Sequence, residues 1–145
     1  NPDFLRIRTA AVKPGTELYD DFAAGDFTLC SDDEKLIELR TVIERAEDVD
    51  TRLVSDHMIN LLQDVEGSLK NDKSKMLAMI DQYLTMPEKD RKMYQAARRM
   101  VRVSKPADMK RLSAGEIARL EKKVMSIPDP YQWEIEMNRL ISRYI

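Results

Sequence analysis

The sequence has 145 residues, of which 43% are hydrophobic and 34% are charged, and its formal net charge at pH 7 is −2. This length and composition suit a single globular domain rather than a disordered chain, and the balance of charges excludes a protein that binds polyanions with its whole surface. No stretch approaches the roughly 20 apolar residues that a membrane-spanning helix needs and no signal peptide is readable, so we expect a cytoplasmic protein without a membrane partner.

The chain opens on a predicted strand, Phe4 to Thr9. Its residues alternate, with Arg6 and Arg8 on the opposite face from Leu5 and Ile7, and a period of two indicates a strand. The only other strand signal is Arg52 to Val54. Because an isolated strand leaves its backbone groups unpaired, we expect these strands to belong to a sheet whose other members lie upstream. We interpret the N-terminus as a cut.

The remainder of the chain carries the signals of helix ends and apolar helix faces. The first expected helix begins at Thr16 and ends at Gly25, the second follows the capping box of Ser31 and Glu34, and the third begins at Ser55 or Asp56 and ends before Gly67. The fourth runs from about Asp72 to Thr85, and the fifth has Pro87 in its first turn. The sixth follows the capping box of Ser113 and Glu116, and the last begins at Asp129-Pro130. The predicted fold class is therefore mainly α, with one or two short strands, Phe4–Thr9 and possibly Arg52–Val54.

Zinc, iron–sulfur and nucleophile chemistry lack the residues they need, whereas carboxylate-only sites for Mg²⁺ or Ca²⁺ stay open although no calcium-loop spacing occurs. Cys30 is the only cysteine and His57 the only histidine, whereas a structural zinc takes four such ligands and an iron–sulfur cluster takes three or four thiolates. The four glycines do not form a phosphate-binding loop. We therefore expect no catalytic residue, no metal ligand and no cofactor held by these residues alone.

The most informative polar cluster is Ser55, Asp56, His57 and Asn60, directly after the second strand signal. One interpretation is a helix N-terminus that Ser55 or Asp56 caps. The other is a strand end that carries binding residues, as the carboxyl ends of strands do in β/α barrels.

Arg6 and Arg8 also allow two interpretations. They could lie on the solvated face of an edge strand. If that face pointed into a barrel instead, the two guanidinium groups would need anionic partners, such as a ligand with a carboxylate.

The most basic stretch of the sequence, Lys89 to Arg111, is a candidate surface for nucleic acid. It contains Arg91, Lys92, Arg98, Arg99, Arg102, Lys105, Lys110 and Arg111. Charged helix faces are usually only solvated, and Asp90 and Asp108 dilute this one, so we do not expect nucleic-acid binding.

Several segments occur in an order that resembles a known family. They are Phe4-Leu5-Arg6-Ile7-Arg8-Thr9, Pro14-Gly15-Thr16-Glu17-Leu18-Tyr19, Val54-Ser55-Asp56-His57, Leu61-Leu62 to Gly67, and Asp72-Lys73 before Met76-Leu77-Ala78-Met79-Ile80-Asp81. Together they resemble the C-terminal part of radical S-adenosylmethionine (radical SAM) proteins, in particular the iron–sulfur oxidoreductases related to oxygen-independent coproporphyrinogen III oxidase. The resemblance covers roughly residues 2 to 100, and the tail from about Lys105 matches nothing that we can name.

The resemblance implies that residues 1–67 are the C-terminal portion of a partial (β/α) barrel and that residues 68–145 are a helical extension. In such proteins a Cys-x-x-x-Cys-x-x-Cys motif holds a [4Fe–4S] cluster that cleaves S-adenosylmethionine to a radical. Those cysteines would lie upstream, because Cys30 matches none of them. By the same resemblance, this chain would close the barrel of its parent and supply substrate- or cofactor-side residues. The candidates are Arg6, Arg8, Ser55, Asp56, His57 and Asn60.

Two other functions remain open at this point. The chain could be a non-catalytic helical interaction module, or a nucleic-acid adaptor that uses Lys89 to Arg111. Under the radical SAM hypothesis, the expected partner is the upstream barrel of the same polypeptide. An exposed strand edge could also pair with a second copy and produce a homo-oligomer.

Overall fold

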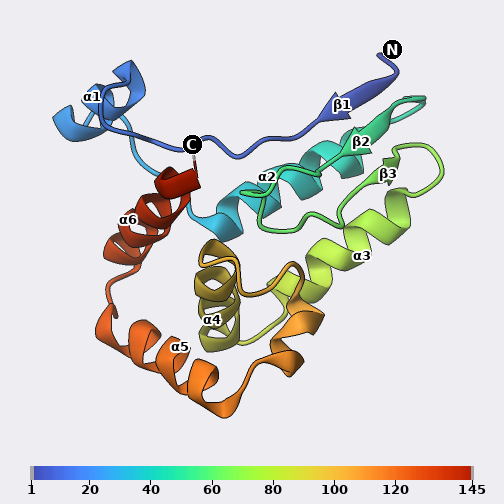
Figure 1. Ribbon diagram of the computed structural model, residues 1–145. Helices are drawn as coiled ribbons and strands as arrows, with labels where there is room; N and C mark the ends of the chain where they lie inside the picture. The colour runs from blue at the N-terminus through green and yellow to red at the C-terminus, as the bar shows by residue number, and fades with distance from the viewer. Residues whose placement is uncertain (1, 145) are drawn as a thin grey trace.

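The computed structural model describes residues 2–144. A small sheet lies at one end of the molecule, and helices make up most of the rest (Figure 1). The strands are β1 (Phe4–Arg6), β2 (Arg52–Val54) and β3 (Gly67–Ser68). The α-helices are α1 (Glu17–Ala24), α2 (Asp32–Arg45), α3 (Lys73–Leu84), α4 (Glu88–Arg99), α5 (Ala114–Ser126) and α6 (Pro130–Ile141), and the 3₁₀ helices are η1 (Pro106–Arg111) and η2 (Ser142–Tyr144). The prediction of a mainly α fold with few short strands is confirmed.

The sheet has the order β1-β2-β3 and is mixed. β1 pairs with β2 in parallel, with Leu5 opposite Leu53, and the chain between them carries α1 and α2. β3 then pairs with β2 in the antiparallel direction. The two predicted strands therefore pair with each other and with β3, so they are not isolated within this chain, while further sheet members upstream stay a prediction. β3 was not predicted because Gly67 and Ser68 show no alternation of apolar and polar residues.

β1 is also shorter than the predicted Phe4–Thr9. The Ile7 N–H still donates to the Val54 carbonyl at 2.9 Å, but β2 ends there. The Thr9 N–H donates instead to the side chain of Asn60, again at 2.9 Å. Strand pairing thus stops where the neighbouring strand turns away.

The helix predicted between Ser55 and Gly67 does not exist. This segment is an irregular loop, and it buries the adjacent pair Leu61 and Leu62 together with Val65. The Ser55 hydroxyl donates to the Leu62 carbonyl at 3.0 Å instead of capping a helix. Tertiary hydrogen bonds therefore replace the helix that the capping signal predicted.

Five of the other predicted helix starts are confirmed, and Pro87, which we expected in a first helical turn, is instead the N-cap of α4. Ser31 and Glu34 form both hydrogen bonds of a capping box at the start of α2, and Ser113 and Glu116 do so at the start of α5. The hydroxyl of Thr16 caps α1, and the carboxylate of Asp129 caps α6. These caps satisfy N–H groups that a helix cannot pair internally.

One hydrophobic core joins β2 to the helices α2 to α6. It includes Leu36, Ile43, Leu53, Met76, Ile80, Tyr83, Tyr94, Trp133 and Met137. The C-terminal tail, for which the sequence offered no relative, supplies the fully buried Trp133 and Met137. Two apolar residues of α2 stay outside this core: Ile37 is 51% exposed and Val42 is 50% exposed.

Each helix within residues 2–144 is too short or too polar to span a lipid bilayer.

Gly67 provides a test of this fold. Its φ is +149°, and a Cβ at this position would lie 2.7 Å from the Cβ of Asp72. We expect Gly67→Ala to lower the free energy of unfolding by about 1–3 kcal/mol, because both the backbone and the contact become strained. The measurement is urea denaturation followed by circular dichroism.

Gly115→Ala is the matched control. Gly115 lies in the first turn of α5 with no atom within 4 Å of an added Cβ. Alanine should raise the stability there by up to about 1 kcal/mol. Equal effects of the two substitutions would contradict the placement of Gly67 beside α3.

Candidate functional site

The carboxyl ends of β1 and β2 lie at the same edge of the sheet because the two strands are parallel. This arrangement brings Arg6 and Asp56 together, with the guanidinium Nε 3.6 Å from a carboxylate oxygen. Their side chains are 44% and 54% exposed, so the pair is open to solvent and contributes little to stability. Both groups are free to contact a ligand or a neighbouring surface.

Ser55 and Asn60 also meet at this edge, but both are buried and fully engaged. The Asn60 amide N donates to the Ile7 carbonyl at 2.9 Å and to the Ser55 hydroxyl at 3.0 Å. Its amide oxygen accepts from the N–H and the hydroxyl of Thr9. Asn60 thus fastens the end of β1 to the end of β2, and its role is to hold the site together.

His57 and Arg8 occupy different surroundings. His57 is half-buried, its carbonyl accepts the Asn60 N–H at 2.9 Å, and its Nδ1 atom is buried without a hydrogen-bond partner among the described residues. Arg8 is exposed and lines a groove of about 370 Å³ together with Leu39 and Val42. The structure therefore joins Arg6 to Asp56 and Ser55 to Asn60, and it places Arg8 apart from them.

A buried ion pair that the sequence did not reveal lies behind this edge. An Nη atom of Arg99 on α4 is 2.6 Å from a carboxylate oxygen of Asp32 at the start of α2, and both side chains are only 2% exposed. Arg99 also donates to the Ile59 carbonyl, and Arg98 donates to the Met58 carbonyl at 2.6 Å. Helix α4 thus holds the loop that carries His57 and Asn60.

The charge state of Asp32 follows from this pairing. Burial by itself would raise the pKa of the Asp32 carboxyl, but the Arg99 guanidinium and then Lys35 hold that pKa below its usual value. The N-terminus of α2 favours a negative charge as well. Asp32 is therefore ionised, and Arg99 is its principal partner.

Asp33 organises a second network next to this pair. The Tyr83 hydroxyl and the Arg91 guanidinium each donate to Asp33 at 2.9 Å. Gln95 donates to the Tyr83 hydroxyl at 2.8 Å and accepts from the indole N–H of Trp133 at 2.6 Å. Burial and the charge of Asp33 raise the pKa of Tyr83, so this phenol stays protonated. The network connects α2, α3, α4 and α6.

Glu134 on α6 borders the same region. Burial and then the nearby Asp32 carboxylate raise the pKa of Glu134 to about 7, whereas Lys35 and the backbone N–H of Asp32 act in the opposite direction. Glu134 is therefore the carboxyl group here whose charge changes near neutral pH.

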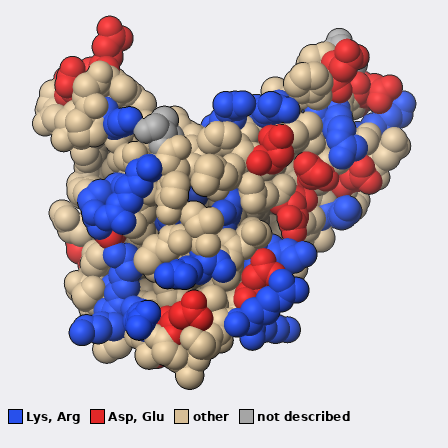
Figure 2. All heavy atoms as spheres, in the orientation of Figure 1, with Lys and Arg blue, Asp and Glu red and all other residues tan. Residues whose placement is uncertain are grey.

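The prediction that Arg98 and Arg99 belong to a basic surface is wrong. All residues of α4 from Met93 to Arg99 are buried, so this helix has no solvated charged face at that end. Arg91 is committed to Asp33 as well. On the face in Figure 2, lysines and arginines alternate with acidic residues and form no continuous basic surface. The signal that could have identified the pair is Asp32-Asp33 in a first helical turn, opposite two arginines within an apolar stripe.

Across residues 2–144, no group of three or more His, Cys, Asp or Glu side chains is placed to hold a metal ion.

Comparison with protein-family models, with curated proteins and with solved structures found no match for this chain.

Arg99→Met tests the buried ion pair. Removing the guanidinium leaves the Asp32 carboxylate buried without its main partner, so we expect the free energy of unfolding to fall by about 3–5 kcal/mol. The measurement is chemical denaturation, with Arg102→Met, an exposed arginine, as the matched control.

A second substitution separates charge from packing. Adding Asp32→Asn to Arg99→Met removes the uncompensated charge and should restore part of the lost stability. If the double variant is no more stable than Arg99→Met, the loss comes from packing rather than from the buried charge.

Glu134 predicts a specific dependence of stability on pH. Its pKa is raised in the folded protein, so the native state binds more protons than the unfolded state between about pH 4.5 and 7, and stability falls as the pH rises through this range. We expect Glu134→Gln to abolish a fall of about 1–3 kcal/mol, measured by thermal unfolding from about pH 5 to about pH 8.

Glu136→Gln is the control two residues away. Hydrogen bonds from Arg139 and Lys123 lower the pKa of Glu136 to about 2, so its contribution is already complete above about pH 4.5 and is lost only as the pH falls toward 2. This variant should lose stability without changing the slope between pH 5 and 8. An unchanged slope in Glu134→Gln would contradict the buried position of that carboxyl.

Proposed function

We propose that this chain is the C-terminal part of a radical SAM iron–sulfur oxidoreductase, related to oxygen-independent coproporphyrinogen III oxidase, and that it completes the barrel of that enzyme. The observation that carries the proposal is the pair of parallel strands, β1 and β2, joined through helices and bearing a polar cluster at their carboxyl ends. This is the unit from which β/α barrels are built, and their active sites lie at those ends.

The two faces of the sheet support this assignment. Leu53 on β2 is fully buried in the helical core, whereas Phe4, Arg6 and Arg52 on the other face are exposed. The helices α2 and α3 lie on the Leu53 side of the sheet (Figure 1) and cover β2 there, whereas Leu5 on the same side of β1 is 39% exposed. A strand pair inside a barrel has one face toward the helices and the other toward the barrel interior.

The outer edge of β1 supports it as well. The Asp3 carbonyl and the Ile7 N–H bond to β2, so in this parallel register the backbone groups of Phe4 and Arg6 point away from β2. No strand within residues 2–144 pairs with them. Phe4 is also 59% exposed. A further barrel strand would satisfy these groups and cover this side chain.

The described residues do not fit the iron–sulfur cluster itself. Cys30, an exposed side chain, is the single thiol of the sequence, and such a cluster needs at least three. Cluster and S-adenosylmethionine would be held by the upstream part of the enzyme. Arg6, Asp56 and His57 are the residues here that would face the substrate side, while Ser55 and Asn60 would keep the strand ends in register.

A non-catalytic interaction module is the second candidate. The exposed Ile37 and Val42 on α2, next to a groove lined by Leu18, Phe27 and Leu39, favour it. Such a module would use its open edge and apolar groove for a protein partner, without any cluster nearby.

Amide hydrogen exchange tests whether another strand pairs with the outer edge of β1. In this chain alone, the N–H groups of Phe4 and Arg6 should exchange faster than those of Leu5 and Ile7, which lie in the ladder. In the full-length protein, Phe4 and Arg6 should become protected. Rapid exchange of both residues there would exclude a neighbouring barrel strand.

The enzyme class needs a separate measurement. Purified without oxygen, the full-length protein should show iron–sulfur absorbance while this chain shows none. A coding region without a Cys-x-x-x-Cys-x-x-Cys motif, or a full-length protein without that absorbance, would end the radical SAM proposal. Protection of β1 without a cluster would favour the interaction module.

A further inference from the structure

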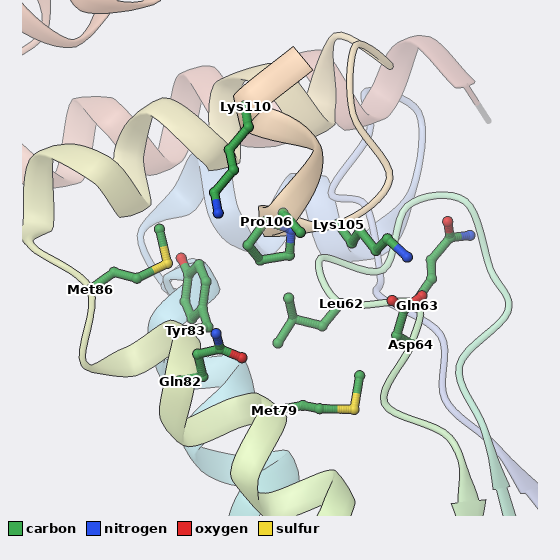
Figure 3. A pocket seen from close by; sticks show the side chains of 11 residues that line it. Leu62, Gln63, Asp64, Met79, Gln82, Tyr83, Met86, Lys105, Pro106 and Lys110 are labelled. Carbon is green, nitrogen blue, oxygen red and sulfur yellow. The ribbon is translucent and has the colours of Figure 1, made fainter. Parts of the chain in front are cut away.

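A second cavity, of about 340 Å³, lies between α3, η1 and the loop from Leu62 to Asp64. None of the six candidate residues of the strand ends lines it. Figure 3 shows Leu62 and Met79 at its base, with Met86 and the ring of Tyr83 at one end. The cavity therefore has an apolar floor, formed by side chains from three separate segments.

The floor is suited to an apolar body. Leu62 is buried, whereas Met79 and Met86 are half-buried. The two methionine side chains can therefore change conformation to fit a ligand in the cavity. Methionine side chains adapt readily to ligands of irregular shape. The Tyr83 hydroxyl is already bound to Asp33 and Gln95, so only its ring contributes.

The rim carries an excess positive charge. Lys105 and Lys110 both line the cavity, and so does one carboxylate, Asp64. Figure 3 shows Lys105 extending toward Asp64, whereas the ammonium group of Lys110 projects over Met86 and Tyr83. Two lysines against one carboxylate give the lining side chains a net charge of +1. The ammonium group of Lys110 stands at the apolar end of the cavity.

We propose that this cavity binds a small amphipathic monoanion, with its carboxylate against Lys110 and its apolar body over Leu62, Met79 and Met86. Charge complementarity selects a single negative charge, and the apolar floor selects a hydrocarbon or ring system over a sugar or a free phosphate. The cavity volume of about 340 Å³ lies at the lower end of the roughly 300–1,000 Å³ that is usual for small-molecule pockets.

The experiment uses decanoate as the probe and the methyl groups of the methionines as reporters. The chain has nine methionines, and ¹³C-methyl labelling gives each a signal; Met79→Leu and Met86→Leu assign the two in question. Decanoate should shift the signals of Met79 and Met86 selectively, with a Kd of about 0.1–1 mM for a ligand of this size. No shift, or larger shifts of methionines elsewhere, would overturn the proposal.

The role of Lys110 is tested with decanol, which has the same chain length and no charge. Lys110→Gln should weaken decanoate binding about three- to tenfold and leave decanol binding unchanged. Lys122→Gln, an exposed lysine on α5, should change neither. If decanoate and decanol bind the original chain equally, or if Lys110→Gln affects both alike, the anionic recognition is wrong.

Discussion

The buried ion pair between Asp32 and Arg99 is the constraint on which the rest of the structure depends. Two opposite charges, each 2% exposed, are held at 2.6 Å between the start of α2 and the end of α4. Desolvating both groups costs several kcal/mol per ion, and the pair is tolerable only because further hydrogen bonds share the charge. Lys35 and the N-terminus of α2 stabilise Asp32, and the Ile59 carbonyl accepts from Arg99.

Arg98 donates to the Met58 carbonyl and Arg99 to the Ile59 carbonyl, so the same helix that closes the core also positions the loop behind the strand ends. The loop in turn carries Asn60, whose amide joins the ends of β1 and β2. The arrangement of the candidate site is therefore fixed from the helical side. The polar side chains in this region are of two kinds. Some, such as Asn60, are buried and use their hydrogen-bonding groups within the protein, and others, such as Arg6 and Asp56, are exposed to solvent.

The two surfaces proposed for binding differ in what they lack. The sheet has an uncovered face and an unpaired outer edge, which are features that another strand and a barrel interior would complete. The cavity beside η1 has an apolar floor, and the excess positive charge at its rim has no anionic partner among the described residues that line it. A macromolecular contact suits the first surface, since backbone groups need a strand to pair with. The second is a small, partly open cavity and suits a small molecule.

The sequence by itself determined the helices that have local signals. The capping boxes of Ser31 and Ser113, the stop at Gly25 and the start at Asp129 are interactions between residues three or four positions apart, so they can be read from the chain. It also indicated the strands at Phe4 and Arg52, but not that they run parallel, and it left open whether Ser55, Asp56 and Asn60 lie at a strand end or at a helix start. The sequence-based prediction placed Arg98 and Arg99 on the surface, which is wrong. The end of α4 is buried on all sides, but its sequence resembles that of an amphipathic helix because the partners of its buried charges lie far away in the chain.

Only the tertiary structure decided where those partners are. Asp32 lies 67 positions from Arg99, Asn60 lies 51 from Thr9, and Tyr83 lies 50 from Asp33. No local pattern encodes such pairs, since the energy of each depends on burial that exists only after the core has formed. The same holds for the loop between Ser55 and Gly67, whose capping signal gave way to contacts from β1 and α4. For this reason the candidate residues could be named from the sequence, but their division into structural and available groups could not.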